Sequence, residues 1–330
     1  MASGIRIGLI GCGGHGLGVL APAFEAVEGA ELTACADVDE VAARRAAGRL
    51  GLSRHYTDYC DMLLGEDLDA AVVALPHHLL KDASLAAIGG GLHVFVEKPM
   101  ALTRADGEQI RDAARSAGVT VMVGYCQRYD EGRRTMKALI ERGAVGDIAV
   151  VNAAKGCPPL TGWLADPATG GGELLWLGVH ITDQVLWMAG STPERVSGEI
   201  VWHPLTSADQ SAVFTIRFES GVLANVFCSQ NVVGGLDFIE VHGSAGRVRA
   251  EWPSGVVRVY SEAVPEYKHP TTIRPRTPQK ANMYRDEMRA WVSSIVDSSP
   301  PPIDAGAGVR VLSIIDAVFE SARTGAPVSP

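Results

Sequence analysis

The chain has 330 residues, of which 47% are hydrophobic and 20% charged, a composition typical of a folded protein with room for two domains. A net charge of -9 argues against nucleic acid or an anionic membrane as a partner, and no apolar run approaches the roughly 20 residues of a membrane span. A strand pattern begins within the first few residues, so we expect no signal peptide. The six cysteines lack metal-ligand spacing, so we expect no metal site and a cytoplasmic protein with reduced thiols.

The first part of the chain alternates strand and helix patterns, which predicts a parallel sheet joined by right-handed crossovers. The expected strands are Ile5–Ile10, Glu31–Ala36, Ala70–Leu75, His93–Val96 and Val119–Val123. The expected helices are Gly14–Ala26, Val41–Leu50, Leu80–Ile88 and Arg104–Ser116. These elements indicate an α/β domain over residues 1–124.

The pattern changes after residue 124, which indicates a second domain over residues 125–330. The expected strands are Ile148–Ala153, Val196–Val201, Ala212–Phe218, Val222–Ser229, Phe238–His242, Arg247–Glu251 and Val256–Tyr260, with antiparallel hairpins around Gly221 and Gly246. The expected helices are Arg133–Arg142, Glu173–Met188, Ala281–Val296 and Ala307–Ala322. The segment Glu262–Lys280 is rich in proline, threonine and charge, so we expect a long irregular excursion there.

A glycine-rich fingerprint, G-x-G-x-x-G, stands between the first strand and the first helix. Its residues are Gly11, Gly13, Gly14, His15 and Gly16. The glycines permit a tight turn, close approach of a pyrophosphate, and close packing of helix and strand. Asp37 follows about 20 residues later at the end of the second strand, where a carboxylate accepts hydrogen bonds from a ribose diol and repels a 2′-phosphate. The pattern predicts a dinucleotide site that favours NAD over NADP.

The apolar run His93–Val96 ends in Glu97-Lys98-Pro99, which places a lysine at the rim of the predicted sheet. Ligands of open α/β sheets bind outside the carboxyl ends of the strands, so Lys98 is a candidate catalytic residue. Glu97 and Lys98 are also expected at the cofactor. So are Leu75, Pro76 and His77, which lie where the third strand ends, although His77 and His78 are more typical of loop residues.

A second constellation follows the glycine triplet at residues 170–172. Trp176, His180 and Asp183 recur at spacings of four and three residues, so they lie near one face of the predicted helix. A histidine there can accept a proton at neutral pH, which makes His180 a second catalytic candidate. A lone histidine on such a helix is more often structural. The presence of Lys98 in the same chain favours a catalytic role for His180.

The fingerprint, Glu97-Lys98-Pro99 and the Gly-x-His-x-x-Asp run that begins at Gly178, taken in this order, resemble the Gfo/Idh/MocA oxidoreductase family over nearly the whole chain. The resemblance implies a Rossmann domain and an α/β domain with a large, mostly antiparallel open sheet. It also implies a nicotinamide between the domains near Lys98 and His180, a homodimer or homotetramer formed through that sheet, C-terminal helices that pack back, and a cis bond before Pro99.

The sequence departs from the family pattern at two positions. The family usually has an aspartate where Trp176 stands, and that aspartate commonly acts with the histidine and the lysine on the reacting hydroxyl. A tryptophan instead offers a flat apolar face and one N–H, so Trp176 is either a platform for a sugar or a core residue. The family also often has a histidine four residues after Pro76, where this chain has Leu80.

Four further residues are candidates for the substrate site, and Asp183 is counted with them. Tyr125 and Arg128 follow the last predicted strand of the first domain, where they either reach the substrate or cofactor or form a packed hinge. Lys155 precedes, and Trp163 lies within, a loop over residues 156–172 that leads to the predicted histidine helix and is either a mobile lid or a solvated connector.

The resemblance implies an NAD-dependent oxidoreductase that acts on a sugar, cyclitol or related polyol. Two alternatives stay open from the sequence. One is a redox-neutral enzyme that retains NAD through oxidation, elimination or epimerisation, and reduction. The other is a non-catalytic NAD-dependent sensor, which the Trp176 departure favours and the presence of both Lys98 and His180 disfavours.

Overall fold

In the computed structural model, which describes residues 4–274 and 279–330, the chain divides into two compact units. The first comprises the chain up to Tyr125 together with Tyr284–Arg310, and the second comprises Cys126–Met283 and Val311–Pro330. The helices α8 (Gln279–Val296) and α9 (Ala305–Thr324) contribute residues to both units. Among the described helices, none is long and apolar enough to cross a membrane.

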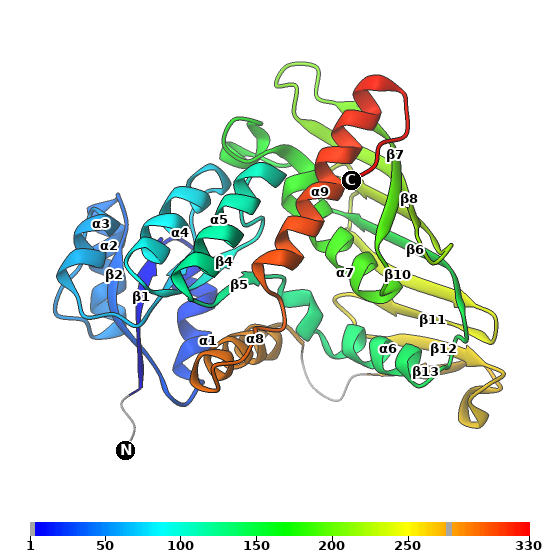
Figure 1. The fold of residues 1–330 in the computed structure, drawn as a ribbon, viewed down its shortest axis with the longest axis horizontal. Helices are drawn as coiled ribbons and strands as arrows, with labels where there is room; N and C mark the ends of the chain where they lie inside the picture. The colour runs from blue at the N-terminus through cyan, green and yellow to red at the C-terminus, as the bar shows by residue number, and fades with distance from the viewer. Residues whose placement is uncertain (1–3, 275–278) are drawn as a thin grey trace. The chain divides into compact units, whose positions relative to one another are not determined.

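The first unit is built on a parallel five-stranded sheet in the order β2-β1-β3-β4-β5 (Figure 1). The strands are β1 (Ile5–Ile10), β2 (Ala30–Ala36), β3 (Ala70–Val73), β4 (His93–Glu97) and β5 (Val121–Gly124). The helical segments are η1 (Gly16–Leu20), α1 (Ala21–Glu25), α2 (Glu40–Leu50), α3 (Tyr59–Gly65), η2 (His77–Leu79), α4 (Leu80–Gly89) and α5 (Arg104–Ala117). The predicted parallel sheet is confirmed, and its order reverses between β1 and β3, which is where ligands of such sheets bind.

Helices pack on both faces of this sheet, and its central strands are buried along most of their length. Figure 1 shows α8 beside α1, on the opposite side of the sheet from α4 and α5. Trp291 of α8 is fully buried and packs against Phe24 of α1 and Phe95 of β4, with ring centroids 5.9 and 5.8 Å away. These contacts join a C-terminal helix to the core of the first unit.

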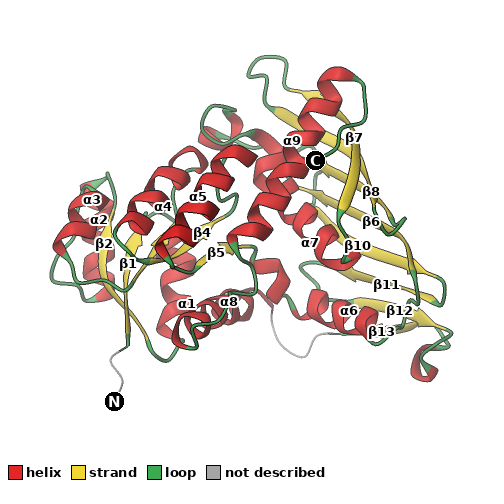
Figure 2. Cartoon of the chain, viewed as in Figure 1, coloured by secondary structure: helices red, strands yellow, loops and turns green. Residues whose placement is uncertain are grey.

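The second unit contains a mostly antiparallel eight-stranded sheet in the order β13-β12-β11-β10-β6-β9-β8-β7 (Figure 2). The strands are β6 (Ile148–Gly156), β7 (Pro193–Trp202), β8 (Asp209–Phe218), β9 (Leu223–Ser229), β10 (Leu236–Gly243), β11 (Gly246–Glu251), β12 (Val257–Ser261) and β13 (Thr271–Ile273). The helical segments are η3 (Cys126–Tyr129), α6 (Glu131–Glu141), η4 (Gly162–Ala165), η5 (Leu174–Gly178), α7 (Val179–Ala189) and η6 (Pro265–Tyr267). The β6–β9 pair is parallel, and the predicted hairpins around Gly221 and Gly246 are confirmed.

The two faces of the large sheet differ in what covers them. Helices α6, α7 and α9 lie on one face, where Phe214 and Ile216 of β8 are buried (Figure 2). Val213 of the same strand and Leu223 of β9 point the other way and are 48% and 46% exposed. This alternation follows from the two-residue period of a strand with one covered face.

The segment Glu262–Lys280, expected to be irregular, contains two ordered elements. Val257 to Val259 of β12 pair antiparallel with Thr271–Ile273, so the excursion returns as edge strand β13 after the short turn η6. The prediction was wrong for β13, because three residues are too few to show a strand period in a sequence. Residues 275–278 of this segment lie outside the described residues.

Candidate active site

The glycine loop follows β1 and fits a dinucleotide. A Cβ added at Gly11, where φ is +98°, would lie 2.2 Å from the Ala74 carbonyl oxygen, and one at Gly16 would lie 2.0 Å from the Gly11 carbonyl oxygen. Such close approach excludes any side chain and holds the loop against the residues that follow β3. At Gly13 and Gly14, by contrast, no described atom lies within 4 Å of an added Cβ. The loop is therefore tight toward the protein and open on the side where a pyrophosphate would approach.

Asp37 stands at the end of β2, beside this loop. One carboxylate oxygen accepts from the Cys12 backbone N–H at 2.7 Å, and the other accepts from the Asp39 N–H at 3.0 Å. The carboxylate is therefore held next to the glycine loop, as the sequence pattern predicts for a residue that contacts a ribose diol.

Glu97 ends β4 and joins the glycine loop to the candidate lysine. Its Oε1 lies 2.7 Å from His15 Nε2, and its Oε2 accepts from the Lys98 backbone N–H at 3.1 Å. Lys98 itself is buried, and the Lys98–Pro99 bond is cis, as the resemblance implies. The structure thus gathers the first unit's predicted residues at the carboxyl ends of β1, β2, β3 and β4. His77, in the same region, is buried, whereas His78 is exposed.

The glycine triplet of the second unit is shaped by two close approaches. A Cβ at Gly170 would lie 2.3 Å from the Trp163 carbonyl oxygen, and one at Gly172 would lie 2.2 Å from an Asp209 carboxylate oxygen. Asp209 begins β8, and its Oδ2 accepts from the Leu174 backbone N–H at 2.6 Å. A buried carboxylate from the sheet therefore caps the start of the helical segment that carries Trp176 and His180, in the manner of an N-cap.

This helical segment does not begin as an α-helix. Leu174–Gly178 forms a π-helical turn, η5, before α7 begins, so the α-helical spacing assumed for Trp176 and His180 does not hold strictly. Trp176 is half-buried, and the Trp163 ring meets it edge-on at 6.5 Å, whereas His180 is buried. The structure brings the predicted aromatic pair together, one ring from the loop over residues 156–172 and one from η5.

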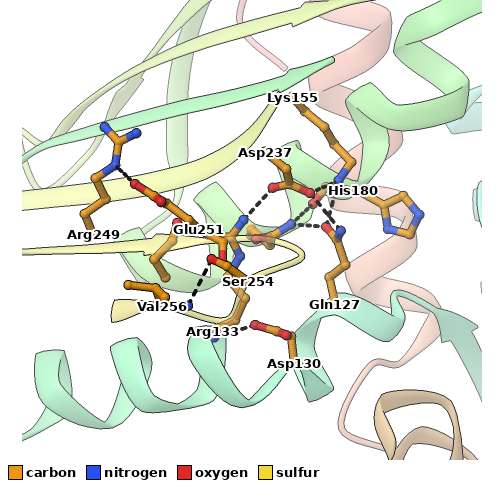
Figure 3. A network of polar contacts seen from close by, with 12 residues as sticks. Gln127, Asp130, Arg133, Lys155, His180, Asp237, Arg249, Glu251, Ser254 and Val256 are labelled. Carbon is orange, nitrogen blue, oxygen red and sulfur yellow. Dashed lines mark hydrogen bonds and ion pairs between the residues drawn. The ribbon is translucent and has the colours of Figure 1, made fainter. Parts of the chain in front are cut away.

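Lys155 belongs to a buried polar network in the second unit (Figure 3). Its ammonium pairs with Asp237 and donates to Gln127 Oε1 at 3.2 Å, while Gln127 Nε2 donates to Asp237 at 3.0 Å. Arg133, fully buried in α6, pairs with the other oxygen of Asp237. Burial alone would raise the pKa of Asp237, but the charges of Lys155 and Arg133 hold that pKa below its ordinary value.

The network reaches the helix that carries His180. Gln184 of α7 donates to Gln127 Oε1 and also to the His180 carbonyl oxygen, the latter at 3.2 Å. Figure 3 shows that side chains from β6, β10, η3 and α7 converge here. The backbone of His180 is therefore linked, through the amides of Gln184 and Gln127, to Lys155 and Asp237.

Arg128, which is partly buried, and Asp183, which is buried, form a second ion pair. The guanidinium donates through Nε and Nη2 to the two Asp183 oxygens at 2.8 and 2.6 Å, and it lies 5.6 Å from the centre of the Trp187 ring. Asp183 thus engages Arg128 through both carboxylate oxygens. Tyr125, which ends the first segment of the first unit, is fully buried.

Known families match both units. Residues 5–125 match the oxidoreductase family with an NAD-binding Rossmann fold, and residues 133–249 match the GFO/IDH/MocA C-terminal domain. The chain belongs to the Gfo/Idh/MocA oxidoreductase family.

Relatives in this family span the whole chain. D-xylose 1-dehydrogenase (NADP(+)) 2 of Haloferax volcanii is 28% identical and covers 98% of this chain and 99% of its own length. Myo-inositol 2-dehydrogenase of Thermotoga maritima is 26% identical and covers 93% of each chain. A solved levoglucosan dehydrogenase, in complex with NADH and L-sorbose, superposes with a TM-score of 0.93 over 99% of each chain at 21% identity, which shows a shared fold.

The sequence did not single out the partners of Lys155 in the family's second domain. Asp237 and Asp209 each lie at or next to the first residue of a strand that we expected to begin later, and Lys155 lies beyond the predicted end of its strand. The two-residue alternation of buried side chains along the strand was the signal that could have identified Asp237. Asp237 shares the parity of buried Ile239 and Val241, so extending the strand would have turned its carboxylate toward the helices.

Proposed function

We propose that this protein is an NAD(H)-dependent oxidoreductase that moves a hydride between nicotinamide and a hydroxyl-bearing carbon of a sugar, cyclitol or related polyol. The observation on which the proposal rests is the position of Glu97. Its carboxylate contacts His15 of the glycine loop and accepts a hydrogen bond from the backbone N–H of Lys98. The names of the xylose and inositol dehydrogenases among the relatives support the substrate class.

In the proposed oxidation, His180 accepts the proton of the substrate hydroxyl while Lys98 stabilises the developing alkoxide by charge and hydrogen bond. The carbon that bears the hydroxyl loses a hydride and becomes a carbonyl. A bound nicotinamide supplies the hydride acceptor. In the reverse direction His180 returns the proton and Lys98 polarises the carbonyl.

We propose that Asp37 gives the protein a preference for NAD over NADP. Its carboxylate is fixed beside the glycine loop by the Cys12 and Asp39 N–H groups, where a ribose diol would add further hydrogen bonds. A 2′-phosphate at the same place would meet a like charge. Gly11, Gly13, Gly14, His15, Gly16, Leu75, Pro76, His77 and Glu97 complete the proposed cofactor site.

The substrate site is proposed on the second unit. Trp176 and Trp163 meet edge to face and offer apolar surface to the C–H side of a sugar ring. Lys155 supplies a cation whose position is set by Asp237. Tyr125, which belongs to the first unit, remains a proposed substrate contact. We assign Arg128 and Asp183 to support of α7, because each engages the other through two hydrogen bonds.

Substituting Lys98→Met tests the catalytic assignment. We expect turnover on the best polyol of an activity screen to fall by roughly 10²–10⁴-fold, with NADH affinity near that of the unmodified protein. Lys81→Met is the matched control, because Lys81 also lies in the first unit but forms a partly exposed pair with Asp106. Unchanged turnover in Lys98→Met would remove this lysine from the mechanism.

Cofactor stoichiometry separates the alternatives. Release of one NADH per substrate oxidised supports the dehydrogenase, whereas product formation with NAD retained would support the redox-neutral cycle. Binding of NAD without turnover of any sugar or cyclitol would support the sensor.

We also propose that the protein forms a homodimer or homotetramer through the uncovered face of the large sheet. Exposed Val201, Val213 and Leu223, which are 60%, 48% and 46% accessible, support this choice of surface. Sedimentation of the protein and of Val213→Glu would test it, with dissociation expected for the variant.

A further inference from the structure

Lys155 is a buried ammonium whose hydrogen bonds are incomplete. Its side chain is only 5% exposed, and an ammonium has three N–H donors. Asp237 accepts from one of them and Gln127 Oε1 from another. Among the residues that the structure describes, no third acceptor lies within hydrogen-bonding distance of Nζ. Because a buried donor without an acceptor is costly, the third N–H indicates a place for an oxygen that the chain itself does not supply.

An aromatic ring bounds the ammonium on another side. The centre of the Trp252 ring lies 5.6 Å from Lys155 Nζ, which suits a cation–π contact but is too far for a hydrogen bond to the ring. The backbone N–H of Trp252 donates to the Asp237 carbonyl oxygen at 3.0 Å, so the ring and the carboxylate are held to each other. The ring therefore limits where the ammonium can lie without using its third N–H.

Gln127 sets the direction of the ammonium through an amide whose own orientation is fixed. Its Nε2 donates at 3.0 Å to Asp237, because an ionised carboxylate can only accept. Its Oε1 therefore faces Lys155, which can only donate, and the same oxygen accepts from Gln184 Nε2. The Gln184 amide is oriented in turn by the His180 carbonyl oxygen, to which it donates at 3.2 Å.

The chemistry of position 127 is therefore demanding. The side chain there must donate at one atom, accept at another and reach as far as β6 and α7. An ionised carboxylate cannot donate, an aliphatic chain can do neither, and a shorter amide does not reach as far. Figure 3 shows the side chains of Gln127, Lys155 and Asp237 pointing toward one another, which is the arrangement that these requirements describe.

We propose that the third N–H of Lys155 donates to a hydroxyl of the substrate other than the reacting one, and that Gln127 is the positioning residue that aims it there. Because Gln127 contacts both Lys155 and the amide that holds the His180 carbonyl, one side chain sets the spacing between two recognition points of the second unit. The substrate must then carry a second hydroxyl at a fixed place relative to the first. The inference rests on the proposed function and adds Gln127 to it.

The test compares two variants and their combination on the best polyol of an activity screen. Lys155→Met should raise KM roughly tenfold or more while kcat changes by less than about threefold, because a contact remote from the reacting carbon binds substrate and transition state alike. Gln127→Met should raise KM by roughly threefold to tenfold, also with little change in kcat. In the Lys155→Met background, Gln127→Met should raise KM no further, because its effect acts through the lysine.

Substrate analogues and controls make the result specific. Among monodeoxy analogues of that polyol, the one that lacks the contacted hydroxyl should have a raised KM with the unmodified protein, and Lys155→Met should not raise it further. Gln127→Asn, which withdraws the amide by one methylene, should give the pattern of Gln127→Met and replaces it if that variant fails to fold. Gln109→Met, at an exposed position of α5, should leave KM unchanged.

Three results would count against these proposals in different ways. Equal increases in KM from Gln127→Met in both backgrounds, or a loss confined to kcat, would overturn the positioning role of Gln127. An unchanged KM of Lys155→Met for the polyol and for every analogue would overturn the whole inference and leave the proposed function intact. Failure of the unmodified protein to oxidise any polyol with NAD or NADP would overturn the proposed function together with the inference.

Discussion

Two buried carboxylates, Glu97 of the first unit and Asp237 of the second, are partnered differently. Glu97 of the first unit shares its oxygens between the His15 ring and the backbone of the next residue, Lys98. Asp237 of the second unit pairs with two buried cations, Lys155 and Arg133. Both have a pKa below the ordinary value despite burial, because positive charge compensates the cost of leaving water.

The difference shows how each site depends on the fold. The first site is formed mainly by backbone, because its glycines approach carbonyl groups closely. Its one central side chain is the Glu97 carboxylate at the end of a strand. The second depends on side chains from β6, β10, α6 and η3, which only the register of the sheet and its covering helices bring together. We therefore expect substitutions at the second site to affect stability more and those at the first to affect cofactor binding more.

The largest expected effect follows loss of the shared carboxylate in the second unit. Asp237→Ala leaves Lys155 and Arg133 buried without their negative partner, which should lower the free energy of unfolding by about 3–5 kcal/mol. Urea denaturation followed by tryptophan fluorescence measures this change, because Trp163, Trp176, Trp187, Trp202 and Trp252 all lie in the second unit.

The matched control removes a carboxylate whose partner is at the surface. Asp67→Ala breaks the pair with Arg6, in which the Asp67 side chain is 87% exposed, and should change stability by about 0–1 kcal/mol. Equal losses of unfolding free energy in Asp237→Ala and Asp67→Ala would show that the buried network contributes no more to stability than a surface ion pair does.

The same contrast explains what the sequence could predict. The parallel sheet, the glycine loop, Asp37 and Glu97-Lys98-Pro99 were predictable because each is a local pattern with a local physical cause. Asp237 and Gln127 were not, because both are distant from their partner Lys155 along the chain. Asp237 meets it through the pairing of β6 with β10, and Gln127 reaches it from η3. The π-helical turn at Leu174–Gly178 was missed for a related reason, since its cap, Asp209, comes from a strand rather than from the helix's own sequence.

A second, smaller effect is a pH dependence of stability that arises at Asp209. Burial raises the pKa of this carboxyl to about 7, whereas an unfolded aspartate titrates near 3.9. Between these values the folded state binds more protons, so this contribution to stability is complete below about pH 4 and is lost as the pH rises through about 7. Backbone hydrogen bonds, that of the Leu174 N–H first among them, lower the pKa of Asp209, but the effect of burial is larger.

Substituting Asp209→Asn isolates this contribution, because asparagine is neutral at every pH. The stability of the unmodified protein relative to the variant should fall by up to about 1.4 kcal/mol per pH unit between about pH 4 and pH 7. Urea midpoints measured at half-unit intervals would show it. Parallel pH curves for the two proteins would mean that Asp209 keeps its charge on folding, and that the cap on Leu174 does not titrate.

The smallest effect concerns the partly buried Arg128–Asp183 pair. The question is whether this ion pair of the second unit contacts substrate or only supports α7. Arg128→Lys keeps the charge but replaces two parallel hydrogen bonds with one, so stability should fall by about 1 kcal/mol. If the pair supports α7, KM for the best polyol should stay within about twofold, because support of a helix is shared among many contacts. A large rise in KM with unchanged stability would instead assign Arg128 to the substrate. In that case a charged group of the second unit would bind a ligand, as is proposed for the first unit, rather than only another protein side chain.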